Sequence, residues 1–224
     1  FHFAFSALLG LATAAMVFWV WYPAPFDELL GGRELFLLLV SVDVIIGPLL
    51  TLIVYAPSKP KAELFRDIGF IVVLQLAALT YGIWSVIQAR PVFIAFEGDR
   101  FRVVRMVDID RSKLSEAPQA LRDLPLFGPK PLGVRLAAPT DPDYLPSIKS
   151  ALQGDHPAFR PSRWLPYEQQ HEAVLASARP LALLGGTDER SKNTVQNQLK
   201  NSGVSGDQMA FLPLIAMGAS DWTV

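Results

Sequence analysis

The 224-residue chain contains no cysteine. Disulfides, thiolate catalysis, iron–sulfur clusters and cysteine-type zinc sites are therefore excluded. The sequence also lacks a serine-nucleophile elbow, a phosphate-binding loop and a dinucleotide fingerprint. His156 and His171 have no acidic neighbour at metal-ligand spacing, and the scattered acids form no carboxylate pair. The sequence thus predicts no catalytic residue, no metal site and no cofactor.

Charged residues are scarce in the first part of the chain. Residues 1–90 hold only 5 of the 20 Lys and Arg and 6 of the 21 Asp and Glu. Residues 91–224 hold 15 of each sign, so this part has no formal net charge. Such a split indicates two regions that face two different solvents. The balanced second region argues against a nucleic-acid partner, which would select a basic face.

Three apolar runs occupy the first region, at about 1–22, 34–56 and 68–88. Each has roughly the 20 apolar residues that a hydrocarbon core requires. We therefore expect a membrane protein with three transmembrane α-helices in residues 1–90, followed by an α+β periplasmic domain in residues 91–224. The chain begins inside an apolar run and ends inside an expected strand, so we expect both ends to be trimmed.

The orientation follows from the short loops between the apolar runs. The loop 57–67 carries Lys59, Lys61 and Arg66, whereas the loop 22–33 carries a single basic residue. The positive-inside rule then places loop 57–67 in the cytoplasm. This predicts a multi-pass protein of the bacterial inner membrane with a cytoplasmic N-terminus and a periplasmic C-terminal domain.

Asp43 is an ionisable residue within the second apolar run. Such a group is costly in lipid and usually faces protein or water. One interpretation is a structural hydrogen bond to Thr80 or Tyr81 on the third run, at a similar depth. Another is a polar contact for a partner helix, and a third is a proton relay.

Gly47 and Pro48 follow one turn after Asp43. Proline removes a backbone hydrogen bond and bends a helix, and glycine allows close helix approach. The bend either packs within the bundle or opens a lateral groove. For the second case we predict partner binding by a small set of residues: Asp43, Gly47, Pro48, Thr51 and Thr80.

The second region alternates between expected strands and short helices. Expected strands are 92–96, 101–109, 211–217 and 221–224, expected helices are 115–123, 143–152, 166–178 and 188–201, and 127–131 is expected to be an ordered loop. Gly185-Gly186-Thr187-Asp188 is expected to be a loop with a helix cap. This mixture is typical of the α+β class.

Several stretches, in order and spacing, resemble the TfpX/TfpZ family of type IV pilin accessory proteins. These are Trp21-Tyr22-Pro23 with Gly31-Gly32; Val42-Asp43 followed by Gly47-Pro48-Leu49-Leu50-Thr51-Leu52 and Tyr55; Leu74-Gln75 with Tyr81-Gly82; Arg90-Pro91-Val92 followed by Asp99-Arg100-Phe101; and Phe211-Leu212-Pro213-Leu214 with Asp221. The similarity is strong over about 20–105, patchy over 106–205, and returns near the end.

This resemblance implies an inner-membrane protein without enzymatic activity that helps its cognate major pilin to assemble or persist. The implied partners are the type IV major pilin, other inner-membrane pilus assembly components and the lipid bilayer. An alternative is a membrane-anchored sensor whose periplasmic domain binds a small ligand. A third possibility is a cell-envelope enzyme that uses His156 or His171.

Overall fold

The computed structural model describes residues 2–56, 58–184, 193, 197 and 209–224. The chain divides into two compact units. Unit 1 comprises Phe1–Val92, Arg105–Asp108 and Pro125–Pro129, and unit 2 comprises Phe93–Val104, Ile109–Leu124 and Lys130–Val224. The chain therefore passes between the two units more than once.

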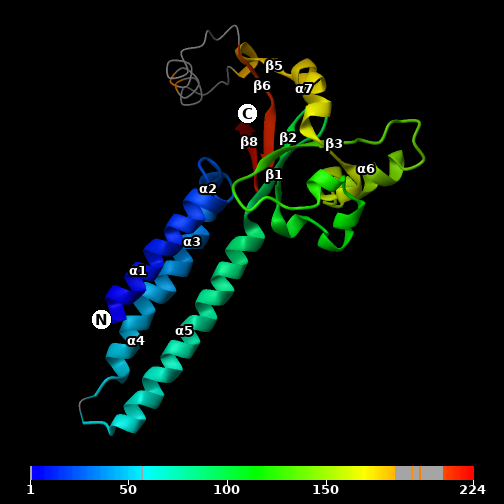
Figure 1. Ribbon diagram of the computed structural model, residues 1–224. Coiled ribbons are helices and arrows are strands. Elements are labelled where there is room, and N and C mark those ends of the chain that lie inside the picture. The colour runs from blue at the N-terminus through cyan, green and yellow to red at the C-terminus, as the bar shows by residue number, and fades with distance from the viewer. Residues whose placement is uncertain (1, 57, 185–192, 194–196, 198–208) are drawn as a thin grey trace. The chain divides into compact units, whose positions relative to one another are not determined.

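Unit 1 is mainly helical (Figure 1). Its elements are α1 (His2–Ala15), the π-helical η1 (Met16–Trp21), α2 (Phe26–Leu29), α3 (Gly32–Val40), the π-helical η2 (Ser41–Ile46), α4 (Gly47–Val54), α5 (Lys61–Ala89) and the short 3-10 turn η3 (Met106–Asp108). The helices α3 and α4 both pack against α5.

The expectation of three transmembrane helices is wrong. In the part of the chain that the structure describes, only α5 is long and apolar enough to cross a membrane. The first apolar run yields a shorter apolar helix, Ala7–Trp21. The second run is divided into α3, η2 and α4, because a π-helical turn precedes Pro48, which cannot donate a backbone hydrogen bond. The number of apolar residues in a run does not reveal such interruptions of a helix.

The core of unit 1 lies where η1, α3 and α5 meet. It is formed by Val17, Tyr22, Phe36 and Val86, each no more than 9% exposed. The Tyr22 hydroxyl donates a 3.0 Å hydrogen bond to the Val86 carbonyl near the end of α5. Gly32 allows this approach, because a Cβ there would lie 2.6 Å from the Tyr22 ring.

Unit 2 is built on a six-stranded sheet in the order β4-β3-β1-β2-β7-β8. The strands are β1 (Pro91–Phe96), β2 (Phe101–Arg105), β3 (Lys130–Val134), β4 (Trp164–Leu165), β7 (Pro213–Ala216) and β8 (Ala219–Thr223). The pairs β1–β3 and β2–β7 are parallel, and β3–β4 and β7–β8 are antiparallel. A second sheet pairs β5 (Arg179–Pro180) with β6 (Ala210–Phe211).

The remaining elements in the described part of unit 2 are short helices. They are η4 (Arg111–Glu116), η5 (Gln119–Leu121), α6 (Tyr144–Leu152), η6 (Pro157–Phe159), η7 (Pro161–Arg163), η8 (Tyr167–Gln170), α7 (His171–Ser177) and η9 (Leu181–Leu184). The α+β class is confirmed, as are the expected strand 92–96 and the helix 143–152. The expected helix 115–123 is instead two 3-10 segments, and the second strand ends at Arg105. The expected helix 188–201 and the 185–188 loop fall almost wholly outside the described residues.

Candidate functional site

A close helix contact in unit 1 involves the glycine of the Gly47-Pro48 step. Gly47 begins α4 and is buried, and Pro48 follows in the first turn, where its missing N–H is tolerated. A Cβ on Gly47 would lie 1.7 Å from Nε2 of Gln75 on α5. The Thr51 hydroxyl donates a 3.0 Å hydrogen bond to the Gly47 carbonyl. The Gln75 amide therefore occupies the space that the absent side chain leaves.

We expect Gly47→Val to lower the free energy of unfolding of unit 1 by about 1–3 kcal/mol, because the new side chain must displace Gln75. Thermal unfolding of the full chain in detergent would measure this. Gly69→Ala on α5 is the matched control, since nothing lies within 4 Å of the added methyl group. Adding Gln75→Ala to Gly47→Val should recover part of the loss. Equal melting temperatures for Gly47→Val and Gly69→Ala would contradict the proposed crowding.

The other two predicted partner-binding residues lie on neighbouring elements. Asp43 lies in η2, but its side chain is outside the described part of the structure. Thr80 is exposed on α5, and its hydroxyl donates a 2.7 Å hydrogen bond to the Leu76 carbonyl one turn earlier. Tyr81 beside it is 69% exposed and packs against the Trp84 ring. The structure thus places Gly47, Pro48 and Thr51 together on α4, and Thr80 on an exposed part of α5.

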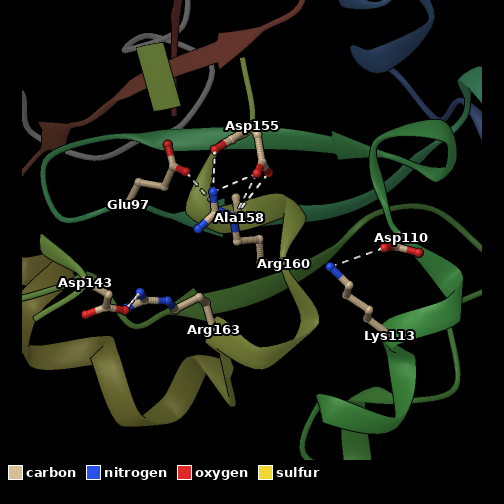
Figure 2. Close-up of polar contacts among 8 residues, drawn as sticks. All are labelled: Glu97, Asp110, Lys113, Asp143, Asp155, Ala158, Arg160 and Arg163. Carbon is tan, nitrogen blue, oxygen red and sulfur yellow. Dashed lines mark hydrogen bonds and ion pairs between the residues drawn. The ribbon is translucent and has the colours of Figure 1, made fainter. Parts of the chain in front are cut away.

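Unit 2 contains a buried ion pair next to the β1–β2 turn. The Glu97 carboxylate lies 2.7 Å from Nε of Arg102, and these side chains are only 7% and 14% exposed. The other Glu97 oxygen accepts a 3.2 Å hydrogen bond from the Ala158 N–H, which Figure 2 shows. The Ala158 carbonyl in turn accepts a 2.8 Å bond from the Trp164 indole. Glu97 therefore connects the turn to the segment that precedes β4.

Two further arginines of this segment bind carboxylates (Figure 2). Arg163, with a 7% exposed side chain, pairs with Asp143 just before α6, and Arg160 holds Asp155 at 2.6 Å. In the β1–β2 turn, the hydrogen bond from Arg100 holds the pKa of Asp99 below its usual range. These acids are bound by arginine, which favours a structural role over proton transfer.

Metal and histidine chemistry finds no support among the described residues. They contain no group of three or more His, Asp or Glu side chains that could hold a metal ion. His156 packs edge-on against Phe159 at 5.4 Å, and His171 is exposed at the start of α7.

Comparisons with known proteins point to one process. A model of the family "Fimbrial assembly protein FimB" matches residues 1–31. The "Fimbrial assembly protein, serogroup E1" of Dichelobacter nodosus is 33% identical over 224 residues, which is 100% of this chain and 87% of that protein. The chain belongs to the fimbrial assembly protein family.

Two further fimbrial assembly proteins of Dichelobacter nodosus support this. The serogroup I protein is also 33% identical over 100% of this chain and 87% of its own length. The protein of serogroups C1 and C2 is 40% identical over 119 residues, or 53% of this chain and 88% of its own. No solved structure matches the chain. The process predicted from the TfpX/TfpZ resemblance is thus supported, while that finer family name stays a prediction.

The sequence patterns indicated the helices of unit 1 as the candidate site of this fimbrial assembly protein. They did not indicate the buried polar residues of unit 2. Glu97 and Arg102 were expected to be ordinary turn and strand residues. The available signal was weak, because a polar residue beside a turn is usually solvated. Gln75 lies in the third apolar run, and its position against Gly47 suits a structural role.

Proposed function

We propose that this protein is a non-catalytic accessory factor of type IV pilus assembly, anchored in the bacterial inner membrane. In this role it binds the cognate major pilin as a chaperone or adaptor and promotes its stability or assembly. The observation that carries the proposal is the similarity to fimbrial assembly proteins along the whole chain. The names of these relatives describe an assembly process.

Membrane anchoring is supported by the surface of α5. An apolar stretch of 18 residues within α5 has a mean hydropathy of 2.0, yet only 11% of this stretch is buried inside the protein. The core helix of a water-soluble protein would be mostly buried, so lipid is the better solvent for these side chains. Lys59, Lys61 and Arg66 flank the N-terminal end of α5, and the positive-inside rule assigns that end to the cytoplasm. Unit 2 then lies in the periplasm.

The cytoplasmic N-terminus expected from the sequence was inferred from three spans and stays a prediction. The remaining topology still suits a pilin accessory factor. One membrane contact and one periplasmic contact with the same pilin would raise the effective concentration of each, so neither needs to be tight. We place the membrane contact at Asp43, Gly47, Pro48, Thr51 and Thr80, where polar and small groups favour helix association.

Co-purification tests this function. The tagged full-length protein is extracted with mild detergent from membranes of cells that make pilin, and co-eluting proteins are identified by mass spectrometry. We expect the major pilin to be enriched over other abundant membrane proteins. An eluate without pilin would contradict the proposal, and the specific retention of a small ligand would favour a sensor.

Variants locate the membrane contact. Asp43→Leu and Thr80→Leu are each expected to reduce the recovered pilin several-fold at unchanged protein level, because polar side chains stabilise helix contacts in lipid. Ser85→Ala is the control, since it also removes an α5 hydroxyl that bonds a carbonyl one turn earlier. Unchanged pilin recovery with both variants would reject this contact without rejecting the function.

A further inference from the structure

The loop Pro125–Pro129 belongs to unit 1, although the chain on both sides of it belongs to unit 2. Two hydrogen bonds hold it there. The Gly128 N–H donates to the Val20 carbonyl at 2.9 Å, and the Arg90 guanidinium donates to the Pro125 carbonyl at 2.8 Å. Arg90 is only 2% exposed, so the second bond is shielded from water. The loop is thus attached near both of its ends.

These two hydrogen bonds fix the position of the loop along the axis of α5. Val20 lies in the last turn of η1, and Arg90 directly follows α5. The Tyr22 hydroxyl bonds the Val86 carbonyl, so the end of η1 lies beside the last turn of α5. The loop therefore lies at the C-terminal end of the apolar helix.

That end of α5 coincides with the expected membrane boundary. Residues 68–89 carry no charge, and 22 helical residues span about 33 Å. A hydrocarbon core is about 30 Å thick. Exposed aromatic side chains lie toward the same end. Trp19 is in η1, Tyr81 and Trp84 are in the last three turns of α5, and they are 83%, 69% and 54% exposed. Trp and Tyr favour the headgroup level of a bilayer.

Two large apolar side chains project from this loop. Leu126 is 67% exposed and Phe127 is 72% exposed, and they occupy neighbouring positions between the two attached ends. Adjacent exposed apolar residues usually mark a contact surface. Here the loop lies at the end of the exposed apolar helix α5, so lipid is the apolar partner that the proposed membrane anchoring brings to it.

We propose that Leu126 and Phe127 insert into the interfacial layer of the bilayer that α5 crosses. This inference rests on the proposed membrane anchoring. The occupant is lipid, at the boundary between headgroups and acyl chains, on the side where α5 ends. The loop is then a second membrane attachment, far from α5 in sequence and held beside it by Gly128 and Arg90.

Depth measurements with spin labels test the proposal. Because the natural chain has no cysteine, a nitroxide can be attached at one introduced cysteine in the full chain. The test position is Phe127→Cys, with Leu126→Cys as a second label. The lipid reference is Leu76→Cys on α5 and the water reference is Leu152→Cys on α6, whose native side chains are 55% and 85% exposed. Each protein is placed in nanodiscs of phosphatidylethanolamine and phosphatidylglycerol.

Collision rates with oxygen, which concentrates in lipid, and with a water-soluble nickel chelate then report the environment. We expect the labels at 126 and 127 to favour oxygen over nickel, between the two references and nearer to position 76. Labels that behave like position 152, or that are shielded from both reagents by protein, would overturn the insertion alone. A water-like label at position 76 would overturn the membrane anchor, and the insertion with it.

Discussion

Replacing Trp164 with alanine is expected to lower the free energy of unfolding of unit 2 by about 3–5 kcal/mol. The Trp164 side chain is 1% exposed, and its ring packs edge-on against Phe93 at 5.1 Å. Its indole N–H donates to the Ala158 carbonyl at 2.8 Å. The substitution leaves a cavity and also leaves a buried carbonyl without its donor. Both losses are large against a typical domain stability of about 5–15 kcal/mol.

Pulse proteolysis of the full chain in urea measures this effect. The urea midpoint should fall by more than about 1 M, given a typical dependence of 1–3 kcal/mol per M. Trp164→Phe is the comparison variant, because it keeps one aromatic ring and removes the indole N–H together with the second ring. We expect it to cost about 1–2 kcal/mol. Similar midpoints for the two variants would show that ring packing contributes little.

The second large effect is expected at Glu97. Glu97→Ala removes the partner of the buried Arg102 guanidinium and the acceptor of the Ala158 N–H. Removing one member of a buried ion pair typically costs about 3–5 kcal/mol, because the remaining charge stays buried. The same urea assay should therefore show a loss comparable to that of Trp164→Ala.

Two control variants distinguish the effect of the unpaired buried charge from the effect of a substitution in the same turn. Replacing Glu97 and Arg102 together with methionine should restore much of the stability, because no unpaired charge remains. Asp99→Ala removes an acid two residues away whose side chain is 54% exposed, and its pair with Arg100 should be worth less than about 1 kcal/mol. A double variant as unstable as Glu97→Ala would refute the role of the unpaired charge.

These two sites are joined through one residue. Ala158 accepts from Trp164 with its carbonyl and donates to Glu97 with its N–H. Residues that share a partner usually have non-additive effects. We therefore expect Glu97→Ala combined with Trp164→Ala to cost less than the sum of the single losses.

Local sequence patterns predicted the strands whose pairing partner lies nearby in the sequence. The strand beginning near Val92 and the final β7–β8 hairpin are confirmed. Strand β3 was missed, because Pro129 and Pro131 resemble loop residues. It forms through parallel pairing with β1, which brings Phe93 opposite Lys130. Such pairing joins distant segments and leaves no short-range pattern in the sequence.

The expectation of three transmembrane helices failed for a different reason. Apolar composition predicted helices in the first region but could not detect η2, the π-helical segment that divides the second run. The Gly47-Pro48 step was recognised as unusual, yet its contact depends on Gln75, 28 residues later. The polar site of unit 2 was missed because burial of Glu97 and Arg102 depends on the tertiary fold.

The division of the chain has a practical consequence for anyone who wants unit 2 as a separate reagent. Arg105–Asp108 and Pro125–Pro129 interrupt the sequence of unit 2 but belong to unit 1. Cutting the chain after α5 would separate these inserts from Arg90, whose carbonyl and guanidinium hold Met106 and Pro125. A fragment that starts at residue 91 would thus contain two segments that have lost their hydrogen-bond partner Arg90. Binding assays on this fragment would not report the behaviour of the intact protein.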